Sequence, residues 1–189
     1  YWQVYLHKTG IAADALLVSI LKRAREMAKK GSTLGSYHPL MHFLFKDVNP
    51  DDFNEEDLDL FVLLDDIDIM SAIKEWQFHE DPILSEMSRR LLRRQLPKIR
   101  VQLEPIDYGV KQLMRAQAAS IFGESDEAIL DYFVHTGVLK NDAYRSDGGG
   151  IRILKKDGNV VDVAAASDNY NLDSLKDTVT KFYITYWEF

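Results

Sequence analysis

YWQVYLHKTGIAADALLVSILKRAREMAKKG, residues 1–31, shows a helical pattern throughout. Its apolar side chains recur at spacings of three and four residues, which places them on one face of an α-helix. They are Val4, Ile11, Leu16, Leu17, Ile20, Leu21, Ala24, Met27 and Ala28. Gly31 stands where the C-terminal cap of a helix belongs. The stretch therefore predicts one long amphipathic helix over residues 1–30.

The chain begins without an initiator Met or a capping residue, and two aromatic residues lead directly into the helical pattern. A natural N-terminus rarely looks like this, so we expect these residues to be an interior helix of a larger protein. Such a helix would lack its upstream packing partner. We therefore expect an exposed apolar face around Val4, Ile11 and Leu17.

Further helix starts follow before residue 100. Acidic residues cap free amides and oppose the helix dipole, which predicts helices beginning near Asp51 and Asp65. The second of these has an apolar face made of Ile69, Ile73 and Trp76. Pro82 after Asp81 marks another start, since proline suits the first helical position, and Pro97 ends that helix. The first hundred residues are thus predicted to be all-helical.

Beyond Pro97 the apolar period changes and strands become frequent. Residues 98–105 alternate as a strand, and residues 107–123 are helical again. The run IRILKKDGNVVDV predicts a hairpin, because Asp157-Gly158-Asn159 supplies a tight turn between two β-rich segments. A short helix leading into a strand is expected over 126–139, another short helix over 171–179 and a final strand over 180–189.

The order strand, helix, strands, helix, strand is ferredoxin-like in element order. We therefore predict an α+β fold, in which an all-helical N-terminal half precedes a small α+β unit with an antiparallel sheet. The predicted division lies near residue 100, giving a helical region over 1–100 and a C-terminal domain over 101–189.

Composition narrows the class of protein. The formal net charge of -7 argues against a broad nucleic-acid surface, which needs clustered Lys and Arg. The absence of cysteine excludes disulfides, thiolate metal sites and a Cys nucleophile. No apolar stretch is long enough to cross a membrane, and no signal peptide is recognisable. We expect a cytoplasmic protein.

The sequence offers weak candidates for a metal or phosphate site. The five histidines have uninformative spacing, and Pro39 between His38 and His42 disfavours a helix that would stack those two. The carboxylates of LLDDIDI suit either an acidic metal site or a capped helix start, and the helix start is favoured. The DGGG segment at 147–150 could form a phosphate-binding loop, but we favour the interpretation that it is a flexible loop leading into the hairpin.

A basic cluster stands out in this acidic chain. It comprises Arg89, Arg90, Arg93, Arg94, Lys98 and Arg100. Arginine suits bidentate phosphate binding, but it also pairs with carboxylates of the neighbouring acidic helices or of another subunit. We favour the pairing interpretation.

The first helix carries a possible nucleotide-binding stripe. Tyr1, Tyr5 and Lys8 follow an i, i+4, i+7 spacing, which aligns them on one helical face. An aromatic ring one turn from a lysine is a reasonable wall for a nucleotide pocket. Spacing alone favours a core helix with a solvated lysine, and both interpretations stay open here.

Two segments resemble a known family. VYLHKTGIAADALLVSILKRA, with its pattern of tyrosine, any residue and His-Lys, resembles a helix of HD-domain phosphohydrolases of the deoxynucleoside triphosphate triphosphohydrolase type. Residues 58–99, which end in Arg94, Leu96 and Lys98, resemble that family's next segment. The resemblance covers about residues 1–100, and the C-terminal unit resembles that of bacterial members more loosely.

The resemblance implies an activity whose metal site lies elsewhere. In the family, a His, a His-Asp pair and a distant Asp bind a divalent metal (Mg, Mn, Fe or Zn class), and water attacks the α-phosphorus of a dNTP. This chain has no His-Asp dipeptide, so the metal-binding part is expected upstream of Tyr1. The chain itself is expected to hold no catalytic residue, metal ligand or cofactor. By resemblance Tyr5 binds substrate, and His7 and Lys8 bind nucleotide phosphate at the interface of a homo-oligomer.

Two functions therefore stay open at the level of sequence. The first is the C-terminal part of an HD-type nucleotide phosphohydrolase, which contributes a substrate-pocket wall and oligomer contacts. The alternative is a non-enzymatic regulatory or assembly module, in which Tyr5 and Lys8 are structural.

We expect the purified 189-residue chain to hydrolyse no dNTP with Mg²⁺ or Mn²⁺, because its sequence offers no credible metal-ligand set. Release of inorganic triphosphate, measured by ion chromatography, is the assay. Metal-dependent release by the chain alone would contradict this expectation.

Overall fold

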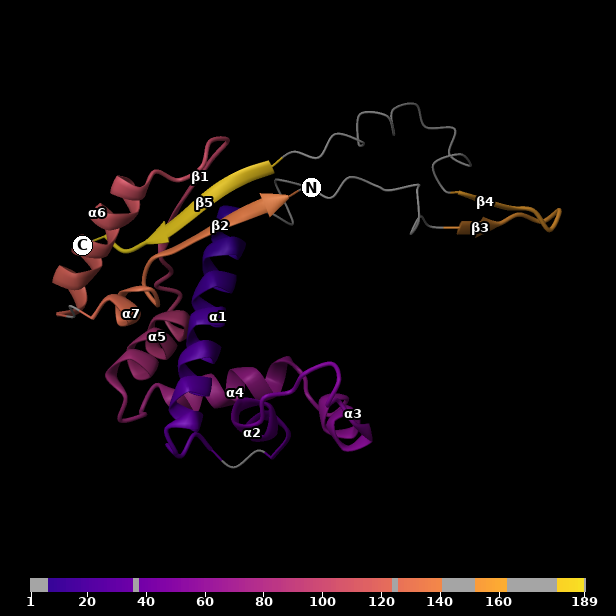
Figure 1. The fold of residues 1–189 in the computed structure, drawn as a ribbon, viewed down its shortest axis with the longest axis horizontal. Coiled ribbons are helices and arrows are strands. Elements are labelled where there is room, and N and C mark those ends of the chain that lie inside the picture. Colours follow the sequence, from indigo (N-terminus) through magenta and orange to yellow (C-terminus); the bar gives the residue numbers. More distant parts are fainter. Residues whose placement is uncertain (1–6, 36–37, 124–125, 141–151, 163–179, 189) are drawn as a thin grey trace.

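The computed structural model describes residues 7–35, 38–123, 126–140, 152–162 and 180–188. Its helical part consists of α1 (Lys8–Lys29), α2 (His38–Phe45), α3 (Glu55–Phe61), α4 (Asp66–Trp76) and α5 (Pro82–Leu92). Figure 1 shows α1 running from the small sheet down to the other helices, so that this one helix reaches both parts of the molecule. α1 contacts α2, α5 and strand β1 (Lys98–Gln102).

The predicted first helix exists, but it starts later than predicted. His7 is the N-cap, with an extended backbone (φ -65, ψ 135) and a side chain that accepts a hydrogen bond from the Thr9 amide. Tyr1 and Tyr5 lie outside the described residues. Because His7 is not helical, the proposed stripe of Tyr1, Tyr5 and Lys8 on one continuous helix is wrong.

The C-terminal end of α1 follows the sequence prediction. Gly31 adopts a positive φ of 82°, which favours glycine. Its amide donates to the Ala28 carbonyl, and the Ser32 amide donates to the Met27 carbonyl. These two bonds form a Schellman motif and end the helix.

The capping rules predict the starts of α4 and α5 correctly but misplace the start of α3. Asp65 and Asp81 are the N-caps of α4 and α5, as predicted. α3 starts after Asn54 rather than near Asp51, because Asn54 and Asp57 form the capping box. α5 ends at Leu92, before Pro97, and Arg94 beyond it has a positive φ of 55°.

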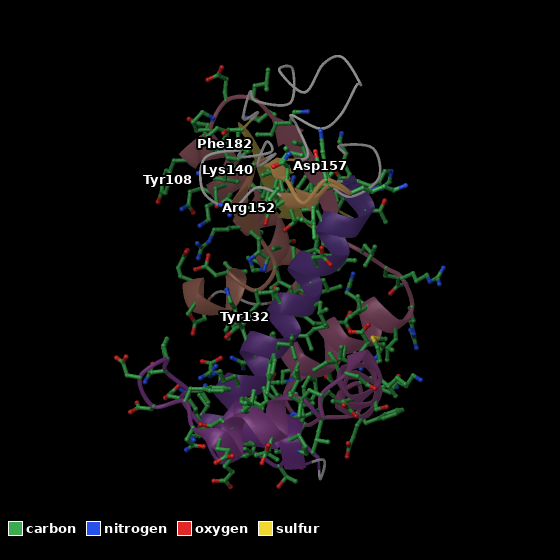
Figure 2. All side chains as sticks on the ribbon, turned by 90° about the vertical axis from the view of Figure 1, so that its right-hand side faces the viewer. Tyr108, Tyr132, Lys140, Arg152, Asp157 and Phe182 are labelled. Atoms are coloured by element: carbon green, nitrogen blue, oxygen red, sulfur yellow. The ribbon has the colours of Figure 1, made fainter. Side chains whose placement is uncertain are left out.

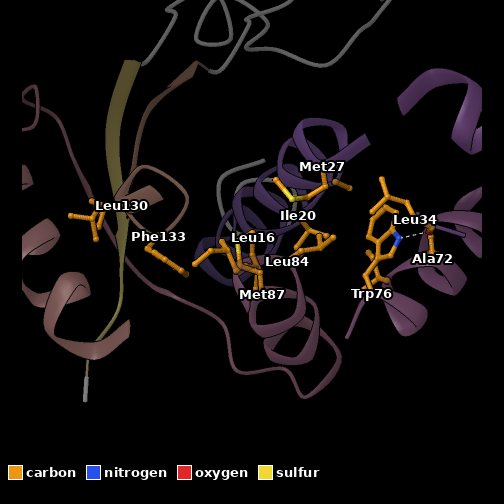
Figure 3. Close-up of a cluster of buried hydrophobic side chains, with 14 of the residues drawn as sticks. Leu16, Ile20, Met27, Leu34, Ala72, Trp76, Leu84, Met87, Leu130 and Phe133 are labelled. Atoms are coloured by element: carbon orange, nitrogen blue, oxygen red, sulfur yellow. Dashed lines mark hydrogen bonds between the residues drawn. The ribbon is translucent and has the colours of Figure 1, made fainter. Parts of the chain in front are cut away.

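The core is one continuous cluster that extends from the helices to the sheet (Figure 3). Ile20 of α1, Trp76 of α4 and Met87 of α5 are fully buried in its helical part, and Ile69 and Ile73 lie on the predicted face of α4. The Trp76 indole N–H donates to the Leu34 carbonyl at 2.7 Å, which satisfies its buried polar group.

The expected apolar exposure on the first helix is not found at Ile11. That side chain is only 7% exposed, and Leu17 is partly buried against the core. Val4 lies outside the described residues. The chain's own residues therefore cover Ile11, and the expectation of an uncovered face there was wrong.

The described strands form two separate antiparallel sheets. β1, β2 (His135–Lys140) and β5 (Thr180–Tyr186) form the first, in the order β1-β5-β2. α6 (Tyr108–Phe122) and α7 (Glu127–Leu130) lie between β1 and β2 in the chain. β3 (Arg152–Leu154) and β4 (Val160–Asp162) form the predicted hairpin as a second sheet, with Gly158 at a φ of 82° in its turn.

The α+β prediction is therefore confirmed. The described strands do not join into a single sheet, so the ferredoxin-like likeness is limited to element order. The helix predicted over 171–179 lies outside the described residues. The division near residue 100 stays a prediction, although Phe133 and Ile184 belong to the same core cluster as Ile20. Within the described residues, no helix has the length and apolar character needed to cross a membrane.

Gly137→Ala should destabilise the sheet. Gly137 pairs with Tyr183 across β2 and β5, and an added Cβ would lie 2.5 Å from the Tyr183 ring. We expect a loss of about 1–3 kcal/mol in the free energy of unfolding, the usual cost of overpacking. Urea denaturation followed by circular dichroism would measure it.

Gly10→Ala is the matched control, because an added Cβ at this helical position meets nothing within 4 Å. It should be neutral or should stabilise by up to about 1 kcal/mol through helix propensity. Equal losses in both variants would contradict the steric explanation.

Candidate functional site

The residues predicted from the family resemblance are not gathered in a described pocket. His7 and Lys8 are exposed at the start of α1, and Tyr5 lies outside the described residues. The His7 side chain caps the helix by accepting a hydrogen bond from the Thr9 amide. The roles of these three residues stay predictions.

The acidic helix start at Asp65 and the histidine His42 have structural roles in the described part of the chain. Asp65 and Asp68 form the capping box of α4, which confirms the predicted helix start. His42 bonds the Asp57 carboxylate at 2.6 Å, and Lys46 binds the same group. The lysine and histidine bonds lower the pKa of Asp57 to about 2. Among the described residues no three His, Asp or Glu side chains form a metal-ligand set, and DGGG lies outside them.

Two residues of the basic cluster pair within α5. Arg89 and Arg90 both bind Glu86, and the Arg90 guanidinium also lies 4.6 Å from the Trp187 ring centroid. Intramolecular pairing is thus confirmed for these two residues, but with a carboxylate of α5 rather than of the acidic helices. Arg93 and Arg94 are exposed.

A buried ionic network joins α1 to α5 and to the segment before β2. Arg23 donates to both Asp81 oxygens, at 3.1 and 2.6 Å, and to Glu26 at 2.6 Å. The Tyr132 hydroxyl donates to Glu26 at 2.8 Å. The Arg23 bonds lower the pKa of Asp81 against the effect of burial, and burial together with Glu26 raises the pKa of Tyr132.

His135 is the titratable group with the most unusual surroundings. Its Nε2 lies 2.5 Å from the buried Ser19 hydroxyl of α1, while Tyr132 supplies a backbone hydrogen bond. Burial lowers the pKa of His135, and the nearby charges of Lys22 and Lys111 lower it further, whereas Asp131 raises it. The surroundings of the ring therefore favour its neutral form.

His135 lines a polar hollow of about 340 Å³ at the outer edge of β2. Its lining residues are Lys22, Lys111, Ala128, Asp131, Tyr132, Val134, His135 and Thr136. Asp131 is bound by Arg115 at 2.8 Å and approached by Lys111 at 3.7 Å. Arg115 is buried and also pairs with Glu127.

An apolar hollow of about 350 Å³ adjoins the polar one and shares Lys111 and Thr136 with it. Its other lining residues are Pro105, Ile106, Tyr108, Gly137, Val138 and Phe182. Figure 2 shows Tyr108 and Phe182 on the same side of the molecule, above Tyr132. Tyr108 is 74% exposed.

Sequence reasoning missed both hollows because their residues come from distant segments. Ser19 and His135, for example, are separated by 116 positions. His135 was one of five histidines without informative spacing, and no local signal distinguishes it from the others. The antiparallel pairing of β2 with β5 and the contact with Ser19 determine its place in the structure.

Comparison with known proteins gives the chain a context. No family model matches it. A solved structure of a phosphohydrolase from Bacteroides thetaiotaomicron matches with a TM-score of 0.82 and 36% sequence identity, covering 100% of this chain and 47% of that one. The chain resembles part of a phosphohydrolase.

A curated relative adds a second match. The uncharacterised protein YwfO of Bacillus subtilis is 34% identical over 98 residues, which are 51% of this chain and 21% of YwfO. The chain thus spans about half of the phosphohydrolase of the solved structure and a smaller share of YwfO. The likeness to a phosphohydrolase predicted from residues 1–100 is confirmed at this general level.

The lowered pKa of His135 should make the protein less stable in mild acid. The unfolded chain binds a proton near the ordinary histidine pKa of 6.5, whereas the folded chain takes it up at lower pH. Stability from this group is present above pH 6.5 and declines as the pH falls towards the folded pKa. His135→Gln should therefore reduce the loss of unfolding free energy between pH 8 and about 5.

Urea denaturation at several pH values would measure this difference. The parent chain, measured at the same pH values, is the reference. An unchanged pH profile in His135→Gln would show that His135 does not have a lowered pKa.

Proposed function

We propose that this chain is the C-terminal part of an HD-type metal-dependent nucleotide phosphohydrolase, which converts a dNTP to deoxynucleoside plus triphosphate. One observation carries the proposal: the whole chain matches the Bacteroides phosphohydrolase at 36% identity and a TM-score of 0.82. The match supports phosphohydrolase chemistry in general. The choice of a dNTP substrate rests on the His-Lys motif at the start of α1.

Among the described residues no three His, Asp or Glu side chains cluster as metal ligands. On the family resemblance we assign the divalent metal and the attacking water to the HD part of the parent protein. No hydrolytic step is assigned to the residues of this chain. They bind and orient the nucleotide.

Lys8 is suited to that role by its position. It is exposed and occupies the first position of a 22-residue helix, where backbone amides and the helix dipole add to its positive charge. The Lys8 amine, the backbone amides and the helix dipole would together stabilise the negative charge of a phosphate held there. His7 precedes it at the cap, and Tyr5 is two residues further upstream.

The alternative, a non-enzymatic assembly module, is favoured by one surface. Large apolar side chains are exposed along α3 and α4 and the turn between them, at 49–72% of their full accessible area. They are Leu58, Phe61, Val62, Leu63 and Ile67. Such a patch suits a contact with another protein surface, which is also expected of an oligomeric enzyme.

Tyr5→Phe and Lys8→Ala in the full-length parent separate these readings. Tyr5→Phe should slow turnover without changing the fold. Lys8→Ala should weaken nucleotide binding or nucleotide-driven assembly by about tenfold, because a charge-assisted phosphate contact contributes about 1.5–3 kcal/mol. Steady-state kinetics and analytical ultracentrifugation would measure both effects.

Lys30→Ala is the matched control, since Lys30 is an exposed lysine just beyond the opposite end of α1. It should change neither turnover nor assembly. Unchanged turnover in Tyr5→Phe, together with unchanged affinity and assembly in Lys8→Ala, would leave Tyr5 and Lys8 as structural residues.

A further inference from the structure

The polar and apolar hollows meet at one edge of the sheet. β2 is an edge strand, with β5 as its described neighbour, and Thr136 and Lys111 line both hollows. The polar hollow has a volume of about 340 Å³ and the apolar hollow one of about 350 Å³. Together they fall in the range of roughly 300–1,000 Å³ that small-molecule sites occupy.

The polar hollow has an excess of positive charge within an acidic chain. Lys22 lines it from α1 and Lys111 from α6. Among the described residues Lys22 has no ion-pair partner, and the Lys111 amine lies 3.7 Å from Asp131. The carboxylate of Asp131, which also lines it, is already held by the buried Arg115 at 2.8 Å. Two lysines around a compensated carboxylate are suited to an anion.

The apolar hollow is lined by exposed aromatic and aliphatic surface. Tyr108 is 74% exposed and Val138 49% exposed, and Phe182 is the direct cross-strand partner of Val138. Phe182 and Val138 therefore lie on the same face of the sheet, with Tyr108 at the start of α6 beside them (Figure 2). A planar ring inserted here would stack on the exposed Tyr108 and the partly buried Phe182.

We propose that the two hollows form a single binding site for a nucleoside monophosphate. The phosphate lies in the polar hollow between Lys22 and Lys111, and the base lies in the apolar hollow against Tyr108 and Phe182. Lys111 lines both hollows, so its amine can reach the phosphate from the junction between them.

This site is separate from the start of α1. Lys22 follows Lys8 by 14 positions, which corresponds to about 21 Å along a helix. Binding at β2 therefore does not rest on the proposed hydrolytic function. It is measured without turnover, so either proposal can fail while the other stands.

Isothermal titration calorimetry on the 189-residue chain would test the site with three probes. Adenosine 5′-monophosphate carries the base, the sugar and the phosphate, adenosine carries the base and the sugar without the phosphate, and inorganic phosphate carries the anion alone. We expect the monophosphate to bind at least about tenfold more tightly than either fragment, since each fragment makes half of the contacts.

Variants separate the two halves of the site. Lys22→Gln and Lys111→Gln should each weaken monophosphate binding about tenfold and leave adenosine binding unchanged. Tyr108→Ala should weaken the monophosphate and adenosine alike and leave phosphate unchanged. Lys74→Gln, an exposed lysine on α4, is the matched control and should bind all three probes as the parent chain does.

Two results would overturn the proposal. One is the absence of monophosphate binding at millimolar concentration in the parent chain. The other is binding that Lys22→Gln, Lys111→Gln and Tyr108→Ala leave unchanged, because the ligand would then lie elsewhere. All four substituted side chains are at least partly exposed, and circular dichroism would verify that each variant is folded.

Discussion

The contact between Arg23 and Asp81 is the interaction on which the arrangement of the helices depends. Arg23 is only 7% exposed, and a buried guanidinium is tolerated only when its donors are bonded. Asp81 meets this need with both oxygens and also caps α5 by accepting from the Leu84 amide. Glu26 takes a further Arg23 donor and links it to Tyr132, just before β2. One charged group thus fixes α1, α5 and the sheet region relative to each other.

A second buried carboxylate holds a helix that has little apolar packing of its own. Asp57 is the buried residue of α3, whereas Leu58 and Phe61 of the same helix are exposed. Lys46 and His42 bind its carboxylate from the end of α2, and the Asn54 amide donates to it. α3 is therefore attached mainly by polar contacts, which leaves its apolar side chains available to another surface.

What the sequence predicts well in this protein is local. Asp65, Asp81 and Gly31 were recognised because caps and turns depend on a few neighbouring residues. The start of the first helix was misplaced because the apolar spacing extends upstream of His7. The extended backbone of His7 prevents the helix from starting before Lys8. Neither hollow at β2 was predicted, since their positions follow from strand pairing between distant segments. Tyr132 and Glu26, for instance, are 106 positions apart.

The place of β5 in its sheet has a consequence for the order of folding. β1 and β2 pair with β5 on its two sides and are not adjacent to each other. About eighty residues separate β1 from β5, so the sheet depends on contacts of long sequence separation, which form slowly. During synthesis the helices up to α5 can pack while β1 and β2 still lack their shared neighbour. The sheet assembles only when residues 180–186 have emerged, and until then two strand edges stay open to unwanted pairing.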